Sequence, residues 1–480
     1  MNHSTVRERT DRSGRRGRTP AWAVLVLVCG GQFLVILDVS VVNVALPAMR
    51  SDLGIGEAGL QWVVNAYTLA FAGFLLLAGR VSDLFGRERT FLIGLGLFTA
   101  ASLVGGLAQD PWMLIIARTM QGLGAAVLAP TTLAVLTTFF PEGAERTRAI
   151  GTWTAVGAGG GAAGGLVGGL LTDYLSWRWV LLVNVPIGAL LLVGAALCLN
   201  VRRDGVARRL DVSGSVLATV GVASLAYGIA ESASYGWTSG RSLLPIVVGL
   251  VVLALFGVVE SRTAEPLIPL RLFRIRSVSA ANAVLLVTNA ATLANWYFLS
   301  LYMQNVLHYS PVRTGLCFIP HSISVILGSK LAPRLMSYVD ARLIGAAGGL
   351  CAVGGMLWQS TFTAQGTFLG TILGPGILTL FGVGLLMTPI TTAATSGVTM
   401  AEQGVVSGLL NTSSQFGGAL GLTILVTVSV DRISARTGAV GNVEEALASG
   451  YSLAFLISAA LLLAATALIA LLPKPVPPGA

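Results

Sequence analysis

The residue best suited to take part in chemistry is a single carboxylate inside a long apolar stretch. Asp38 stands in the segment LDVSVVNVALP, within an apolar run that begins at Ala21. A charged side chain at the centre of a bilayer costs roughly 3 kcal/mol or more. It persists there by facing a water-filled cavity, by pairing, or by carrying a proton. If the run crosses a membrane, Asp38 is a candidate group for binding and releasing a proton.

A single guanidinium is the natural partner for this carboxylate. Arg118, in the segment ARTMQGLG, is the basic residue that lies furthest from either end of a predicted span. It lies roughly 10 Å below the outer end of its span, and Asp38 lies roughly 26 Å from the inner end of its own, so both are in the outer half. We predict that the two side chains form, or alternate with, a shared electrostatic pair. This pair is predicted to take part in proton coupling. The alternative is a structural salt bridge with no coupling role.

Two further groups of residues are candidates for conformational gating. In GRVSDLFGRER, Gly79 and Gly86 permit a tight turn, while Asp83, Arg87 and Arg89 can form ion pairs in one conformation that break in another. The alternative is a charged loop that only sets the orientation of the neighbouring helices in the membrane. The second group is a series of glycines that lets neighbouring helices approach closely, and its members are Gly160, Gly164, Gly168 and Gly169.

Polar and aromatic residues in the apolar stretches are candidates for contacting a substrate. They are Asn43, Tyr67, Gln121, Asn289, Asn295, Trp296, His321, Asn411 and Gln415. Hydrogen bonding between helices explains an intramembrane Asn or Gln about as well as substrate contact does. His321 can relay protons near neutral pH or act as a simple hydrogen-bond partner, and both roles stay open.

The elements that must position these residues are membrane-spanning helices. Of the 480 residues 54% are hydrophobic and 11% are charged, with a mean hydropathy of +0.79. Soluble chains carry roughly a quarter charged residues, so a water-soluble fold is excluded. We predict an all-α integral membrane protein with about fourteen transmembrane helices, at 21–47, 59–78, 90–108, 111–139, 149–171, 177–199, 212–230, 242–259, 278–303, 314–336, 342–361, 367–394, 404–429 and 449–472.

The charge distribution predicts how these helices are oriented. Most of the 30 Lys and Arg residues fall in loops on one side, which the positive-inside rule places in the cytoplasm. Both termini are then cytoplasmic. We expect residues 1–19 to be a disordered basic tail rather than a signal peptide, and 473–480 to be a second cytoplasmic tail.

Composition also argues against several other kinds of chemistry. The net charge of +9 comes from arginines in short loops rather than from a basic face, so we expect no nucleic-acid partner. The four cysteines lie in apolar runs, where they behave as small hydrophobic residues, and no metal site is predicted. There are three histidines and no GxxxxGK[ST] phosphate-binding loop, so neither an enzyme nor an ATPase is expected.

With its charged loop the chain resembles the major facilitator superfamily, whose members carry a Gly-x-x-x-Asp-x-x-Gly-Arg-x-Arg pattern at this place. Asp38 and Arg118 look like the first-span and fourth-span motifs of its drug:proton antiporters, and the chain is similar to the fourteen-span branch. The glycine series also matches, although Gly165 stands where the family has proline. The resemblance implies two six-helix halves, 20–200 and 277–472, joined by two inserted helices within 201–276.

We therefore predict a proton-coupled antiporter of the cell membrane that exports small amphipathic compounds such as drugs or antibiotics. No cofactor is expected beyond protons as the coupling ion, and the partners are the lipid bilayer and the substrate, with the chain working as a monomer. Two alternatives stay open. One is a proton-coupled symporter that imports a small metabolite, and the other is the membrane subunit of a pump with a separate ATPase.

Overall fold

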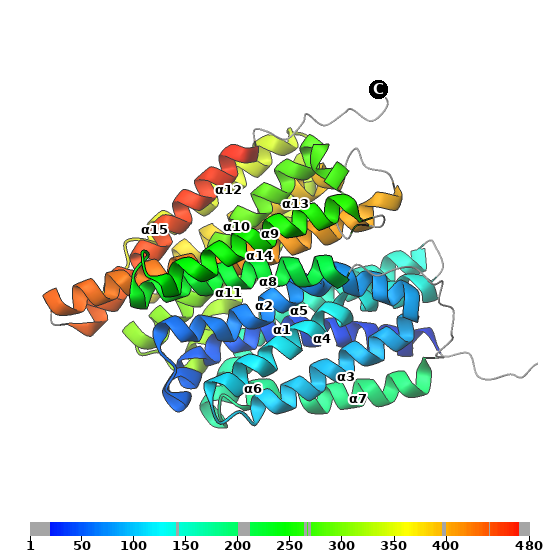
Figure 1. Cartoon of the computed structure of the whole chain (residues 1–480), viewed down its shortest axis with the longest axis horizontal. Helices are drawn as coiled ribbons and strands as arrows, with labels where there is room; N and C mark the ends of the chain where they lie inside the picture. Colours follow the sequence, from blue (N-terminus) through cyan, green and yellow to red (C-terminus); the bar gives the residue numbers. More distant parts are fainter. Residues whose placement is uncertain are drawn as a thin grey trace, which may run out of the picture.

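The structure is a computed structural model, and it describes residues 20–140, 144–199, 212–263, 266, 270–395, 400–440 and 442–469. These residues form a bundle of helices joined by short turns (Figure 1). The predicted tails 1–19 and 473–480 lie outside the described residues, as does the chain from 200 to 211.

The first set of helices, which we call the N-terminal group, packs mainly on itself. It comprises α1 (Ala21–Leu53), α2 (Glu57–Phe85), α3 (Arg87–Gly106), α4 (Pro111–Phe139), α5 (Ala144–Tyr174), α6 (Trp179–Leu182) and α7 (Asn184–Cys198). Within it α1 packs against α4, α5 and α7, while α4 also contacts α2 and α3. α1 is therefore in contact with most of the group.

The last set of helices, the C-terminal group, is built in the same way. It comprises α10 (Arg276–Leu301), the π-helix η2 (Tyr302–Val306), α11 (Pro311–Met336), α12 (Ala341–Gln359), the π-helix η3 (Phe368–Leu373), α13 (Gly374–Thr395), α14 (Met400–Val440) and α15 (Val443–Ile469). α13 packs on α11 and α12, and α15 packs on α10, α12 and α14. The two groups meet where α5 contacts α11, α2 contacts α14 and α1 contacts α10.

Between the groups lie α8 (Val212–Tyr235) and α9 (Gly240–Arg262), which pack against each other (Figure 1). α8 also contacts α2 on one side and α14 on the other. A small apolar cluster of Leu69, Val222, Ala226 and Ala419 joins these three helices. α9 leaves most of its apolar side chains exposed, which fits a face in contact with lipid.

The predicted spans correspond well to these helices. Among the described residues, twelve helical segments are long and apolar enough to cross a membrane. α2 and α8 fall outside that set, so twelve to fourteen spans fit the chain, and the number fourteen stays a prediction. α4 matches the predicted span 111–139, whereas α1 runs six residues past the predicted end at 47, to Leu53.

Local sequence explains how several helices begin. Asp110 caps α4 by accepting a hydrogen bond from the Met113 amide. Pro111 occupies the first turn, where a backbone N–H group would have no intrahelical acceptor, so its absence costs nothing. Ser310 and Pro311 start α11 in the same way. Between α2 and α3, Gly86 has φ of 91°, a conformation that glycine adopts without strain. The tight turn predicted from this glycine is present.

A polar cluster ties together one end of the N-terminal group. The Asp52 carboxylate accepts hydrogen bonds from Trp177 Nε1 at 2.9 Å and from Arg178 Nη1 at 2.7 Å. Arg178 also donates to the Ala108 carbonyl at 3.0 Å. We call this end, where α1 finishes and α4 and α11 begin, the outer end, after the orientation predicted from the charge distribution.

Candidate proton-coupling site

Asp38 and Arg118 form a buried ion pair. Arg118 Nη1 donates to Asp38 Oδ2 at 2.5 Å, and the two side chains are 2% and 0% exposed, respectively. Asp38 comes from the middle of α1, and Arg118 from the second turn of α4. The predicted pairing is therefore present in the structure, while its role in coupling stays a prediction.

The second oxygen of the carboxylate is held by two amide groups. Gln121 Nε2 donates to Asp38 Oδ1 at 3.0 Å, and Asn184 Nδ2 donates to the same oxygen at 2.9 Å. Gln121 also donates to Ser102 Oγ at 2.7 Å. Asp38 thus accepts from one charged and two neutral donors, an arrangement suited to its ionised form.

The guanidinium is fixed as firmly as the carboxylate. Arg118 Nε donates to the Val63 carbonyl at 3.0 Å, and Nη1 donates to Gln121 Oε1 at 3.0 Å. The Arg118 guanidinium carbon also lies 4.4 Å from the centroid of the Tyr67 ring, and that ring stacks on Phe71. A planar group with several donors can make these contacts together, which a lysine ammonium cannot.

Two members of the site were not predicted from the sequence as site residues. Asn184 and Ser102 are both 0% exposed, and they bring α7 and α3 to the ion pair. Gln121 and Tyr67 were predicted to contact substrate, but the structure places them in the hydrogen-bond and ring contacts of the pair itself. The site accordingly draws on α1, α2, α3, α4 and α7.

The arrangement is electrically balanced only while Asp38 is ionised. The negative charge of Asp38 and the positive charge of the Arg118 guanidinium cancel, and both side chains are buried. Adding a proton to Asp38 leaves the Arg118 charge buried without a counter-ion, which is unfavourable by several kcal/mol in a protein interior. Protonation of Asp38 would therefore destabilise this arrangement of the pair.

The predicted substrate residues in the remaining helices do not form one cluster in the structure. Asn289 donates to the Leu285 carbonyl and to Ser414 Oγ, so it joins α10 to α14. Asn411 is exposed, and its amide donates to the Ser407 carbonyl of its own helix. Gln415, also on α14, is half-buried. For Asn289 the alternative of hydrogen bonding between helices is the one observed.

Three other candidates lie within the C-terminal group. The Trp296 ring packs 4.8 Å from that of Phe318, which in turn lies 6.1 Å from the His321 ring. His321 is 0% exposed, and its Nε2 lies 3.1 Å from the Ile372 carbonyl. Asn295 is buried with neither amide atom in a hydrogen bond. An unpaired buried amide is unfavourable, so Asn295 keeps an unused capacity for hydrogen bonding.

The residues predicted for gating lie where helices turn or touch. Arg87 donates to the Ala134 carbonyl at 3.2 Å and to Thr138 Oγ1, so it joins the start of α3 to the end of α4. Arg89 is half-buried in the first turn of α3. Gly79 and Asp83 lie in α2, and their surroundings are outside the part of the chain that the structure describes in detail.

The predicted glycine series does bring helices close together. Positions 160, 164 and 168 of α5 face α1, where an added Cβ at Gly168 would lie 2.7 Å from the Val41 carbonyl oxygen. At Gly169 an added Cβ would lie 2.4 Å from the Pro311 carbonyl oxygen at the start of α11. α5 therefore packs closely against α1 of its own group and against α11 of the other group.

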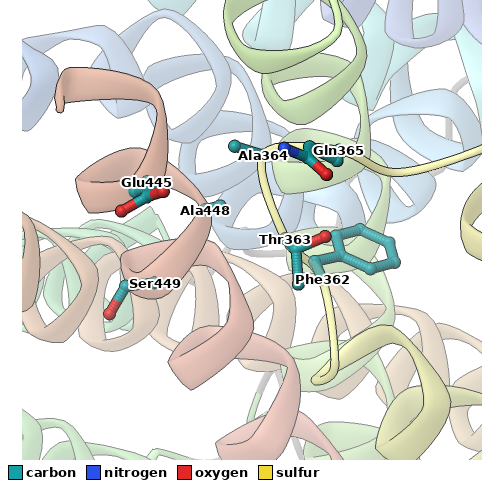
Figure 2. Close-up of a pocket in the computed structure, with 7 residues that line it drawn as sticks. All are labelled: Phe362, Thr363, Ala364, Gln365, Glu445, Ala448 and Ser449. Carbon is teal, nitrogen blue, oxygen red and sulfur yellow. The ribbon is translucent and has the colours of Figure 1, made fainter.

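Two surface hollows lie at the outer end, away from Asp38. One of 360 Å³ is bordered by the loop after α12 and by the first turns of α15, with Glu445 opposite Gln365 (Figure 2). The other, of 410 Å³, lies between the end of α1 and η2. Neither includes a residue that was predicted to bind substrate.

We expect the substitution Asn184→Ala to weaken the site measurably. It removes one of three donors to a buried carboxylate, which corresponds to roughly 1.5–3 kcal/mol for a hydrogen bond to a charged group. The purified protein should unfold at a lower temperature in detergent. Asn411→Ala is the matched control, since that amide is exposed and bonds only to its own helix. Equal melting temperatures for the two variants would contradict the arrangement described here.

These features define a helical membrane transporter with a charged pair buried in one of two packed groups of helices. Residues 28–422 match the family model for the Major Facilitator Superfamily. The chain belongs to this superfamily. The predicted family, the fold class and the expectation of a transporter rather than an enzyme are confirmed.

Similar proteins include exporters of antibiotics and proteins that confer resistance to them. The chain is 46% identical over 476 residues to the cephamycin export protein CmcT of Amycolatopsis lactamdurans, covering 98% of this chain and 96% of that protein. It is 39% identical over 433 residues to the puromycin resistance protein pur8 of Streptomyces alboniger, covering 89% and 86%.

Solved structures show the same fold at low sequence identity. A bacterial homologue of the human lysosomal transporter Spinster, in an inward-facing and unoccupied conformation, superposes with a TM-score of 0.67 at 16% identity. The match covers 94% of this chain and 97% of that one. At this identity the likeness establishes the fold alone.

Proposed function

We propose that the protein is a proton-coupled antiporter that exports small amphipathic compounds, including antibiotics, from the cytoplasm. The observation that carries the proposal is the buried pair of Asp38 and Arg118, whose charges balance only while the carboxylate is ionised. A proton that binds Asp38 from the outside and leaves it toward the inside releases energy that the transporter can use.

The proposed cycle follows from this change in charge. With Asp38 ionised, the pair is neutral, and the transporter with a bound compound passes from the outer-closed arrangement of this structure to an outer-open one, where the compound leaves and a proton from outside binds Asp38. Protonation leaves Arg118 uncompensated and favours a second arrangement in which the site is hydrated. Release of the proton to the cytoplasm restores the pair. The proposed orientation, with both termini in the cytoplasm, makes this sequence of events one of export.

The choice of cargo rests on the relatives. The names of two similar proteins refer to cephamycin and to puromycin, which are different compounds, so the shared machinery does not select one chemical scaffold. Apolar and aromatic surroundings with a few unpaired polar atoms, as at Asn295 and Trp296, suit amphipathic molecules.

Transport into everted membrane vesicles tests this function. We expect vesicles that contain the protein to accumulate cephamycin or puromycin when an inward-acid gradient is imposed, and cells that express it to tolerate more of the same compound. The direction separates export from import, because a symporter would empty such vesicles. Accumulation that persists after the proton gradient is collapsed, while ATP stays high, would favour a pump with a separate ATPase.

A further inference from the structure

Proline 47 leaves a gap in the hydrogen bonding of α1. Pro47 lies inside the helix and has no N–H group, so the carbonyl of Asn43, four residues earlier, loses its usual intrahelical donor. The proline ring also crowds that carbonyl and turns it away from the helix axis. A buried carbonyl without a partner is unfavourable, and this one must find a donor elsewhere.

The donor comes from the other group of helices. Ser300 of α10 donates from Oγ to the Asn43 carbonyl at 2.8 Å, and both residues are buried. Four residues along, Gln304 donates from Nε2 to the Val44 carbonyl at 3.0 Å and to Ser300 Oγ at 3.1 Å. Two side chains of one group therefore bind two adjacent backbone carbonyls of the other.

The segment that carries these donors is itself held in an unusual conformation. Tyr302, between Ser300 and Gln304, begins the π-helix η2, and the Leu307 amide donates to its carbonyl. The Tyr302 hydroxyl donates to the Thr363 carbonyl at 2.7 Å, and its ring stacks on Phe362. Such π-helical turns occur often at functional sites. Here the turn fixes the two donors against the C-terminal group.

We propose that Pro47, Ser300 and Gln304 form an outer latch, a reversible contact that holds the two groups together at the outer end and must open in each transport cycle. The α1 side of the latch begins at the Asn43 carbonyl, which lies five residues beyond Asp38 on the same helix. Next to it is the hollow of 410 Å³ that Pro47 and Asn305 line, which gives water access once the contact opens.

The existence of the latch does not depend on proton-coupled export, but its place in the transport cycle rests on that proposed function. The three residues are positioning residues, since none of them touches the ion pair. A net contact of two side-chain hydrogen bonds shifts a two-state equilibrium by roughly fivefold or more. Breaking the latch should therefore raise the population in which the outer end is open.

Labelling of a buried thiol measures that population directly. Val44 is 0% exposed, so Val44→Cys in a background without the four native cysteines should react slowly with a membrane-impermeant thiol reagent added from the outside. We expect Ser300→Ala combined with Gln304→Leu to speed this reaction roughly fivefold or more. Pro47→Ala should act in the same direction, because it gives the Asn43 carbonyl a competing intrahelical donor.

Thr292→Val is the matched control. Its hydroxyl lies on the same helix but donates to the Thr288 carbonyl of that helix, so its loss should leave the labelling rate unchanged. Equal labelling rates in the latch variants and in this control would overturn the proposal. If the latch variants label faster but the parent protein shows no gradient-driven transport, the latch is supported and the proposed function is rejected.

Discussion

Replacing Asp38 by Asn should reduce gradient-driven transport to the level of vesicles without the protein. Asparagine has the shape of the aspartate but binds no proton in this pH range, so the cycle loses its coupling ion. Efflux or vesicle uptake under an imposed pH gradient measures the effect. Asp52→Asn is the matched control on the same helix, where the carboxylate is 45% exposed and its ion pair contributes about 0–1 kcal/mol.

Loss of transport in Asp38→Asn can also come from instability of the protein, and a second variant separates the two causes. Without Asp38 the Arg118 charge is buried alone, which destabilises a protein by roughly 3–5 kcal/mol. The double substitution Asp38→Asn with Arg118→Gln leaves no net charge in the site and should restore the amount of protein in the membrane. We expect it to remain uncoupled. Normal gradient-driven transport by the double variant would show that this pair is structural only.

The second large effect is expected from Gly169→Val. An added Cβ would meet the backbone of α11 at Pro311, and backbone cannot turn aside as a side chain can. Overpacking of this kind destabilises a structure by roughly 1–3 kcal/mol. Here it destabilises the conformation in which α5 and α11 touch. The variant should insert normally but transport slowly, because the outer end cannot close.

A thiol cross-link measures that closure independently of transport. The Asp173 carboxylate accepts from the Val312 amide at 3.1 Å across the same contact, so cysteines at these two positions should be joined by a short bifunctional reagent. Gly169→Val should abolish the link. In Gly159→Val, on the same helix, an added side chain meets open space, and the link should form as before. Similar yields in both variants would argue against steric control by α5.

The sequence predicted the helices and the ion pair for a common physical reason. Apolar stretches long enough to span a bilayer have no other stable backbone conformation there, which is why the predicted 111–139 span and α4 coincide. An isolated carboxylate and an isolated guanidinium in such stretches each need a partner of opposite charge. Asp38 and Arg118, 80 residues apart, could be paired on that argument alone.

The neutral members of the site could not be predicted in the same way. A buried amide such as that of Asn184 can satisfy itself on many carbonyls or hydroxyls, so its partner is set by the tertiary structure. Asn184 lies 146 residues from the carboxylate that it binds, and nothing in its local sequence indicates that contact. For the same reason Gln121 and Tyr67 were assigned to substrate, although the structure places both against the ion pair.

The latch illustrates a further limit of sequence analysis. Pro47 signals a missing donor in α1, but the hydroxyl that replaces it is 257 residues away and lies beside a π-helical turn. π-Helical turns depend on packing around the turn, here on the contact of Tyr302 with Phe362 and Thr363. The sequence therefore marks one half of this contact and leaves the other unspecified.

The position of α8 also bears on the geometry of the transport motion. This helix touches α2 of one group and α14 of the other, and Thr427 donates to its Ile229 carbonyl at 3.2 Å. Any movement of one group relative to the other must therefore either carry α8 along or break its contacts with α2 or α14. Through α8 the inserted pair of helices thus bridges the two groups at a place separate from the contact between α5 and α11.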